Sequence, residues 1–482
     1  MSEQTPPVAE HVRAELERIS PATDPLTRAF DEAGQSLFLV GGPVRDACLG
    51  LTSHDLDFTT SARPEEIERI LRGLGGPMWD MGREFGTIGT MLQAAGQSWQ
   101  IEVTTFRADS YDADSRKPQV RFGDTIEGDL VRRDFTVNAM AIDLINRRFI
   151  DPHQGLRDLA AKRLRTPGTA EQSFSDDPLR MLRAARFAAR LTLRPDPDVV
   201  RAMMAMGDRL AIVSAERIRD EFSKLLLTNA PRTGLDLLVR TRLADQFIPE
   251  LGALRLEIDE HHRHKDVYQH SLTVLDQAIG LEKARHHEPD LVLRLAALLH
   301  DIGKPKTRRF EPGGKVSFHH HDVVGAKIVR KRLTALKYPN DVIDSVSQLI
   351  ELHLRFHGYG DAEWTDSAVR RYVRDAGPEL ERLHILTRSD CTTRNAAKAT
   401  RLRRAYDELE WRIDELAAQE ELDSIRPDLD GHQIMEILGI KPGRDVGAAY
   451  NFLLERRLDR GPASEDEAKA ELLQWWEQRQ AG

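Results

Sequence analysis

Two aspartates spaced two residues apart, Asp55 and Asp57, stand in the segment HDLDFTT. In an extended strand such side chains point to one face, about 6 to 7 Å apart, while Leu56 and Phe58 face the core. On its own the pattern is more often a solvated strand end. Neighbouring carboxylates repel unless a cation lies between them, and oxygen ligands favour Mg²⁺ or Mn²⁺. Because such ions activate a hydroxyl and stabilise a leaving phosphate, we expect both residues to be catalytic metal ligands.

A glycine pair and an arginine precede the aspartates in LVGGPVRDA. Gly41 and Gly42 allow backbone N–H groups to approach an anion, and the next residues can begin a helix whose N-terminus favours phosphate. Arg45 offers a guanidinium for bidentate phosphate contact. A phosphate cradle beside a metal pair predicts a site for a nucleoside triphosphate.

Short apolar runs bounded by Gly, Asp and Pro predict the strands that position these residues: LFLVGG, HDLDFTT, GTIGTML, SWQIEVTTF, AMAIDLI and RRFIDP. A polar lead with a short helix is expected over 1–33, and a helix over 62–76. After Pro167 the spacing is helical, for example in DDPLRMLRAARFAARL (176–191), and we expect no further sheet.

Composition limits the classes of protein that fit. The 482 residues carry a net charge of −9, so contact with nucleic acid must come from local basic patches. Cys48 and Cys391 are too few for a disulfide framework or a cysteine-built zinc site, which favours a reducing compartment. We find no signal peptide and no stretch near 18 apolar residues, and expect a cytoplasmic protein without membrane contact. The oligomeric state is not predicted.

The segment LVGGPVRDACLGLTSHDLDFTT resembles the first motif of the class II tRNA nucleotidyltransferases, or CCA-adding enzymes, which share the head of the polymerase β superfamily. Bacterial poly(A) polymerases carry the same motif. EGDLVRRDFTVNAMAID resembles a further family motif, which implies that Arg133 reaches the nucleotide while Arg132 and Asp134 brace the site. Glu102 is either a third carboxylate behind the metal pair or a plain strand-face acid. TFRADSYDADSRKPQVRF (105–122) resembles the flexible loop of members that add adenosine.

Four charged side chains spaced three apart are neighbours on a helix: Asp177, Arg180, Arg183 and Arg186. Alone, they are typical of a charged helix face. With the other motifs, the segment resembles the nucleotide-selecting element E-D-x-x-R, with Asp176 in place of Glu. The resemblance implies that Asp177 and Arg180 bond the base edge. A carboxylate accepts from the exocyclic amine of C or A and repels the carbonyl of U or G. Arg183 and Arg186 contact phosphates or brace the helix.

The order H…HD…D in the second half resembles the HD superfamily of metal-dependent phosphohydrolases; its members here are His270, His300, Asp301 and Asp390. His321 and His353 can complete a second metal position. Mixed imidazole and carboxylate ligands suit Mn²⁺, Fe, Ni²⁺ or Zn²⁺. Whether this region hydrolyses a substrate or serves as a scaffold for tRNA stays open.

The segment RNAAKATRLRR carries basic residues with no acid between them: Arg394, Lys398, Arg401, Arg403 and Arg404. They form either a solvated helix face or an RNA-contacting stripe, and we favour RNA contact.

We therefore predict an α+β nucleotidyltransferase head with a polymerase β-like mixed sheet, then an all-α neck, an HD-type helical body and a helical tail. The expected ranges are 1–34 for an N-terminal helical extension, 35–165 for the head, 166–255 for the neck, 256–395 for the HD domain and 396–482 for the tail. The predicted reaction is template-independent addition of CCA to tRNA from CTP and ATP, with Mg²⁺ in the head and a second divalent metal in the HD domain. The alternatives are a poly(A) polymerase, an enzyme adding only CC or only A, and an HD phosphohydrolase with an RNA-binding head.

Overall fold

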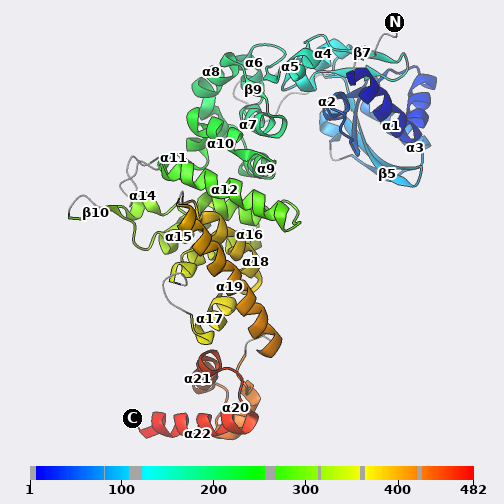
Figure 1. The fold of residues 1–482 in the computed structure, drawn as a ribbon. Coiled ribbons are helices and arrows are strands. Elements are labelled where there is room, and N and C mark those ends of the chain that lie inside the picture. The colour runs from blue at the N-terminus through cyan, green and yellow to red at the C-terminus, as the bar shows by residue number, and fades with distance from the viewer. Residues whose placement is uncertain are drawn as a thin grey trace. The chain divides into compact units, whose positions relative to one another are not determined.

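The computed structural model describes residues 7–80, 82–107, 122–255, 266–312, 316–358, 364–393, 395–420 and 426–481. The chain divides into two compact units, Met1–Pro249 and Glu250–Gly482, whose elements are labelled in Figure 1. The first unit contains a mixed sheet followed by helices, and the second is mainly helical. The predicted fold class is confirmed, while the finer division into five regions stays a prediction.

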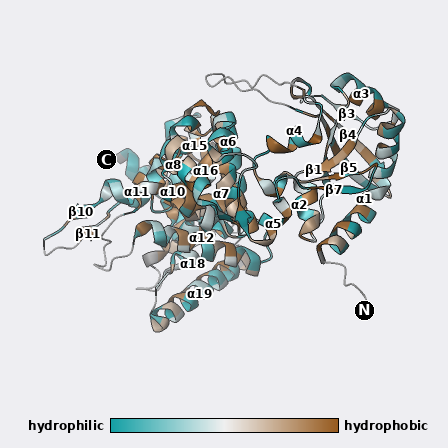
Figure 2. Cartoon of the chain, turned by 90° about the horizontal axis from the view of Figure 1, so that it is seen from above, coloured by the Kyte–Doolittle hydropathy of each residue, from teal (hydrophilic) through white to brown (hydrophobic). Residues whose placement is uncertain are grey.

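Seven strands form the sheet of the first unit, in the order β3–β4–β5–β2–β1–β6–β7. Their bounds are β1 (Leu37–Val40), β2 (Asp55–Thr60), β3 (Met78–Trp79), β4 (Thr87–Ala94), β5 (Gln97–Thr105), β6 (Ala141–Asp143) and β7 (Arg148–Ile150). β2 runs parallel to β5 and antiparallel to β1. The segment LFLV of β1 is buried throughout, and its strand is hydrophobic in Figure 2. Every strand except β3 lies in a run that predicts a strand.

The N-terminal helix is longer than predicted. α1 spans Pro7–Glu32 and continues through Pro21 and Pro25, although the sequence predicts only a short helix there. Its buried residues recur at helical spacing and include Ile19, Ala22, Leu26 and Phe30. Burial of this apolar stripe outweighs the local tendency of proline to end a helix. The other head helices are α2 (Gly42–Cys48), α3 (Pro64–Gly73), α4 (Ile126–Val131) and α5 (Gly155–Ala160).

The prediction of one helix over 176–191 is wrong. α6 (Ala170–Asp176) ends before Asp177, and α7 (Arg180–Leu191) begins three residues later. The cause is Pro178, because the residue before a proline is driven out of the helical region; Asp177 has φ −143° and ψ 101°. Asp177 is therefore in the break between two helices and not on a helix face.

The first unit ends in α8 (Pro197–Met206), α9 (Ala215–Leu226) and α10 (Pro231–Arg240), with α11 (Pro249–Ala253) at the boundary. A small parallel pair, β8 (Arg163–Leu164) with β9 (Arg194–Pro195), was not predicted.

The second unit is built from helices that bring distant histidines together. They are α12 (Val267–Ala284), α13 (Leu291–Leu299), α14 (Lys304–Thr307), α15 (His321–Ala335), α16 (Asn340–Leu352), α17 (Asp366–Ala376), α18 (Leu380–Asp390) and α19 (Ala396–Glu420). A short antiparallel strand pair, β10 (Arg309–Phe310) with β11 (Val316–Ser317), precedes α15, so the expectation of no further sheet after Pro167 is wrong here. The tail helices α20 (Gly431–Leu438), α21 (Arg444–Arg460) and α22 (Glu465–Ala481) enclose a core of their own around Leu453 and Leu472.

Candidate active site and metal centre

Two parallel strands bring three carboxylates together. Asp55 and Asp57 are on the exposed face of β2, alternating with the buried Leu56 and Phe58. In the register of β2 with β5, Asp57 stands opposite Glu102. The alternation predicted from the sequence is therefore present, and strand pairing adds Glu102 beside the aspartates.

The carboxylate of Asp57 is electrostatically strained. Surrounding protein atoms remove water from this carboxylate, and this desolvation is the main reason why its pKa is raised to about 6. The negative charges of Glu102 and Asp55 contribute to the same rise. Arg133 opposes the shift only in part. A divalent cation would relieve this repulsion, and the all-oxygen donor set suits Mg²⁺.

A cavity of about 420 Å³ opens beside Asp57. Its charged lining comprises Arg45, Arg132, Arg133, Arg180, Arg183, Arg186, Arg190 and Arg217, with Asp57, Asp134 and Asp177. Eight arginines therefore face three acids, and the excess positive charge favours a polyanion such as a triphosphate. Gly41 and Gly42 complete the wall next to Asp57.

Gly41 gives Arg133 its place in the cavity. The backbone at Gly41 has φ +71°, and a Cβ there would lie 3.0 Å from Arg133 Nη1. Both the conformation and the lack of room require glycine. Arg133 Nε is buried without a hydrogen-bond partner among the described residues, which leaves a donor for a ligand.

Asp129 contacts two of the cavity arginines and was not among the predicted site residues. Its carboxylate is fully buried and accepts from Arg132 Nη2 at 2.8 Å and from Arg133 Nη2 at 3.0 Å. Burial alone would raise the pKa of Asp129, but the two guanidinium charges outweigh it and lower the pKa. Asp129 thus orients both arginines of the RRDFT segment. Asp129 precedes these arginines by three and four residues, and this helical spacing could have predicted the contact.

A chain of hydrogen bonds joins Arg45 to Arg183 on α7. Arg45 pairs with Asp46 at 2.7 Å and donates to Asn138 Oδ1 at 2.6 Å. Asn138 donates to Asp134, and Asp134 pairs with Arg183 at 2.7 Å. Although burial opposes ionisation, Arg183 and Asn138 lower the pKa of Asp134 to about 2. Arg45 is therefore held rigidly in the cavity wall.

The residues expected to select the base have different partners in the structure. Arg180 donates to the carbonyl oxygen of Arg132 at 2.5 Å and to Ser173 Oγ at 3.0 Å, so its guanidinium is engaged. Asp177 Oδ2 accepts from Arg217 Nη2 at 3.0 Å. Arg217, on α9, thus faces the cavity beside Asp177.

Arg183 and Arg186 both contact Glu221 on α9. Arg186 Nε lies 2.6 Å from Glu221 Oε2, and Arg183 Nη1 lies 3.4 Å from Oε1. Because Glu221 is 5 % exposed, these pairs fasten α7 to α9. Their placement favours the bracing role over direct phosphate contact.

In the second unit, the HD residues form one cluster. His270, His300 and Asp390 place ligand atoms within 4.8 Å of one another, and His270 Nε2 lies 2.9 Å from Asp390 Oδ1. Asp301 Oδ2 lies 3.3 Å from His300 Nε2. The four residues predicted from H…HD…D are therefore in contact.

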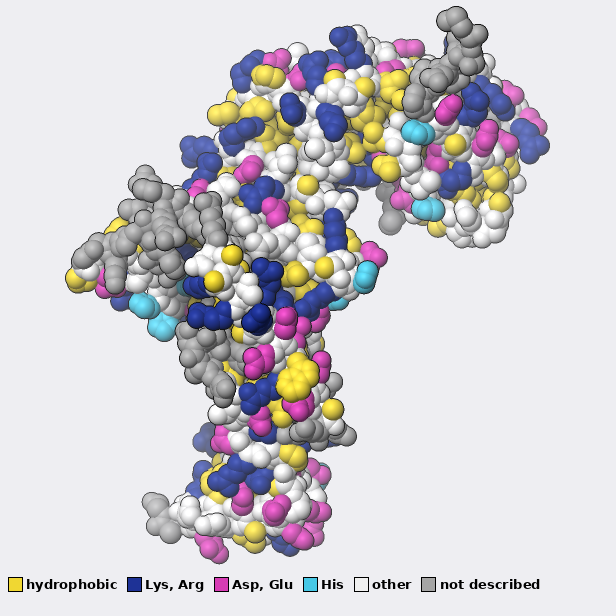
Figure 3. All heavy atoms as spheres, in the orientation of Figure 1, with side chains coloured by type: hydrophobic (Ala, Val, Ile, Leu, Met, Phe, Trp, Pro, Cys, Tyr) yellow, Lys and Arg dark blue, Asp and Glu magenta, His cyan; other side chains and the backbone are white. Residues whose placement is uncertain are grey.

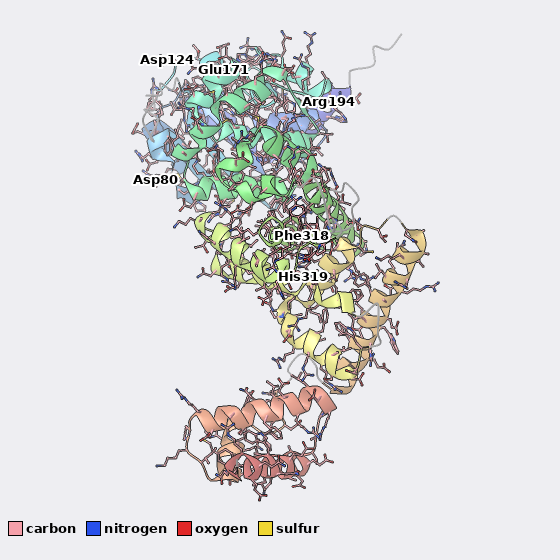
Figure 4. The ribbon with its side chains drawn as sticks, turned by 90° about the vertical axis from the view of Figure 1, so that its left-hand side faces the viewer. Asp80, Asp124, Glu171, Arg194, Phe318 and His319 are labelled. Atoms are coloured by element: carbon pink, nitrogen blue, oxygen red, sulfur yellow. The ribbon has the colours of Figure 1, made fainter. Side chains whose placement is uncertain are left out.

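A second group of three ligands adjoins the first: Asp301, His321 and His353. Asp301 Oδ1 lies 3.3 Å from His321 Nε2, so the two oxygens of Asp301 face the two groups. His321 follows Phe318 and His319, which Figure 4 labels. The residues predicted for a second metal position thus adjoin the first set.

The histidines are oriented as metal ligands. Their Nδ1 atoms donate to backbone carbonyls: His300 to Ala297, His321 to Phe318 and His353 to Ile350, at 2.6 to 2.9 Å. With Nδ1 as the donor, Nε2 is the ring atom that each histidine can offer to a metal. His353 Nε2 is buried without a hydrogen-bond partner among the described residues. The donor set fits divalent transition metals.

The charges of this centre differ between its histidines. Burial disfavours a charged His300, but Asp301 and Asp390 raise its pKa to about 9. Burial and the neighbouring charge of His300 lower the pKa of His353 to about 4. His353 is therefore a neutral imidazole at pH 7.

The basic residues Lys398, Arg401, Arg403 and Arg404 lie exposed on the first turns of α19. In Figure 3, Lys and Arg side chains are interspersed with acids on the visible face of this unit. Arg394 and residues 108–121 of the predicted flexible loop are outside the described part of the chain.

Three stretches match known families. Residues 37–165 match the family described as "Poly A polymerase head domain", and residues 193–254 match "Probable RNA and SrmB- binding site of polymerase A". Residues 267–395 match the HD domain family.

Full-length relatives agree with this division. The chain is 32% identical over 450 residues to an A-adding tRNA nucleotidyltransferase of Deinococcus radiodurans, covering 91% of this chain and 95% of that protein. It is 30% identical over 458 residues to a CC-adding tRNA nucleotidyltransferase of Thermus thermophilus, covering 92% and 94%. The fold also resembles the Bacillus stearothermophilus CCA-adding enzyme solved with CTP, at 24% identity and TM-score 0.65 over 96% and 98% of the two chains.

A head with paired strand carboxylates, a basic cavity and a following HD domain defines a nucleotidyltransferase of the polymerase β type. The chain belongs to the tRNA nucleotidyltransferase family. Among the helices of the described residues, none is both long and apolar enough to cross a membrane.

Proposed function

We propose that the protein adds C, C and A to the 3′ end of tRNA from CTP and ATP, releasing pyrophosphate and using no nucleic-acid template. The observation that carries this proposal is the cavity that joins Asp57 to eight arginines and to Asp177. It offers a metal ligand, cations for a triphosphate and a carboxylate that can read a base.

Asp55 and Asp57 would hold Mg²⁺. This ion usually takes one or two carboxylates and completes its shell with substrate phosphates and water. Such a shell suits the head, since among the described residues three clustered ligand atoms occur only in the second unit. When bound, Mg²⁺ would activate the terminal 3′ hydroxyl and neutralise charge on the α-phosphate.

The chain's own residues position the triphosphate. Arg133, held between Gly41 and Asp129, donates to it, and Gly42 allows close approach of the backbone. Arg45 contributes a guanidinium to the cavity wall and is held there by its bond to Asn138. Positioning and charge stabilisation supply most of the catalysis in phosphoryl transfer.

Asp177 and Arg180 select the base in this proposal. Asp177 lines the cavity and can accept from the amine that C and A share. Arg180 leaves the carbonyl of Arg132 to donate to the ring acceptor beside that amine. U and G would place a carbonyl against Asp177, and an unpaired buried acceptor is costly.

The test is incorporation by the purified protein with Mg²⁺ on tRNAs that end before CCA, after C and after CC. Each nucleotide is offered alone and in mixture, and the products are sequenced. We expect extension to CCA and no further, with U and G rejected. A long A-tail on tRNA and unrelated RNA alike would instead indicate a poly(A) polymerase.

A narrower product is the second candidate. Two relatives that match almost the whole chain are named A-adding and CC-adding enzymes. If this protein shares such a division of labour, an A-adding enzyme would extend only the tRNA that ends in CC, whereas a CC-adding enzyme would extend only the two shorter tRNAs and stop at CC.

The HD centre supports a separate proposal of metal-dependent phosphohydrolysis, because Asp301 places one oxygen toward each ligand group. Mn²⁺, Fe, Ni²⁺ and Zn²⁺ suit these ligands. Metal analysis and hydrolysis of a chromogenic phosphodiester are compared for wild type and Asp301→Ala. Unchanged metal content in the variant contradicts the metal site, and bound metal without hydrolysis favours a scaffold.

For tRNA, we propose contact along the start of α19, with Lys398, Arg401, Arg403 and Arg404, and Arg394 preceding the helix. Each lysine or arginine that neutralises a phosphate adds about one to the salt dependence of binding. Alanine variants should lower the slope of log Kd against log salt by about one each. An unchanged slope would indicate a solvated face.

A further inference from the structure

Two side chains of α1 hold the residue that leads into the metal-binding strand. Arg18 Nη2 donates to the carbonyl oxygen of Ser53 at 2.5 Å, and the Ser53 N–H donates to Glu15 Oε1 at 3.1 Å. Arg18 and Glu15 are themselves joined by two hydrogen bonds of 2.6 and 2.7 Å. Both backbone groups of Ser53 are thus satisfied by one ion pair on another element.

Ser53 passes this restraint to Asp55. The hydroxyl of Ser53 donates to the carbonyl oxygen of Asp55 at 2.9 Å. In the described register, β1 pairs with β2 only from Phe58 onward, whereas β5 pairs from Asp55 onward. The end of β2 that carries the aspartates therefore has a strand on one side only, and α1 fixes the chain that enters it.

Arg18 also contacts the neighbouring strand. Its guanidinium lies over the ring of Trp99, 5.1 Å from the ring centre. Trp99 is 2 % exposed and directly precedes Gln100, the β5 partner of Asp55. One guanidinium therefore bridges the lead-in to β2 and the strand that carries Glu102.

We propose that Arg18 and Glu15 are positioning residues for the metal carboxylates, so that α1 is part of the catalytic apparatus and not only a cover for the sheet. The helix lies before residue 37, where the match to the head family begins. The inference rests on the proposed function, because it requires a divalent ion at Asp55 and Asp57. Removing a residue that orients a metal ligand typically weakens metal affinity by about 10- to 100-fold.

The test measures Mn²⁺ binding to the full chain by electron paramagnetic resonance. Sites of the HD centre are subtracted with an Asp55→Asn, Asp57→Asn double variant, and nucleotide binding is measured without metal. We expect Arg18→Ala to weaken the head-site Mn²⁺ affinity by about tenfold while metal-free nucleotide binding stays unchanged. Arg18→Lys should restore part of the affinity, because an ammonium replaces only one arm of the guanidinium fork.

Two matched variants separate positioning from stability. Leu26→Ala removes a fully buried side chain of the same helix and should lower Tm without changing Mn²⁺ affinity. Arg13→Ala changes an exposed arginine of α1 and should change neither. If Arg18→Ala lowers Tm but keeps wild-type Mn²⁺ affinity, α1 is purely structural. If wild type and the double aspartate variant bind Mn²⁺ equally, the head metal site itself is wrong.

Discussion

The guanidinium of Arg133 lies against Gly41 so closely that a Cβ at residue 41 would meet Nη1 at 3.0 Å. Gly41 also has φ +71°, so a side chain there is both strained and misplaced. We expect Gly41→Ala to cost about 1 to 3 kcal/mol of stability and to raise the KM for nucleotide by displacing Arg133. Gly34→Ala is the control, because Gly34 has φ +69° with open space around its Cβ position. Equal KM values in the two variants would contradict a role for the close approach.

Asp57→Asn should abolish incorporation without unfolding the head. The variant removes a carboxylate whose ionised form is disfavoured by burial and by the charges of Glu102 and Asp55, so Tm in the absence of metal should not fall. Thermal unfolding and nucleotide incorporation are measured on the same preparation. Near-normal turnover in this variant would overturn the metal assignment.

Asp134 should make the head sensitive to acid. Its pKa is lowered to about 2 from an ordinary 3.8, so its stabilising effect is complete above pH 4 and is lost as pH falls toward 2. The loss amounts to about 2 kcal/mol between those limits. Urea unfolding across this range should show a smaller pH dependence in Asp134→Asn than in wild type. Parallel curves would mean that the Asp134–Arg183 pair does not control acid stability.

Asp177→Ala should relax base choice. Without the carboxylate, U and G no longer face a repelling acceptor, and we expect discrimination against them to fall by roughly tenfold or more. Arg217→Ala is informative beside it, because it frees Asp177 Oδ2 from its 3.0 Å partner but keeps the carboxylate. Single-nucleotide kcat/KM values for C, A, U and G measure both effects. Unaltered ratios in Asp177→Ala would place base selection elsewhere.

The two ligand groups of the HD centre should lose metal separately. His353→Ala removes a ligand of only one group, and His270→Ala removes a ligand of the other. If wild type holds two ions, each variant should retain about one by elemental analysis, because the shared Asp301 remains in both. Loss of all metal in His353→Ala would instead indicate a single site.

Features whose residues are close together along the chain could be predicted without the structure. Period-two alternation places Asp55 and Asp57 on one strand face, and the adjacency of His300 and Asp301 joins two ligands of the HD centre. Even the break before Arg180 is local, since Pro178 forces Asp177 out of the helix. The three-residue spacing of Asp177, Arg180, Arg183 and Arg186 instead suggested one continuous helix, although Pro178 indicates a break.

The residues that these groups contact from distant parts of the chain follow from packing and could not be predicted from the sequence. Arg217 pairs with Asp177 across 40 residues, Arg183 with Asp134 across 49, and Glu15 holds Ser53 across 38. A periodic pattern determines which face of an element is polar, but packing decides what covers that face. Packing also explains α1. Its two prolines would locally favour an end to the helix, but burial of an apolar stripe stabilises the helix through both of them.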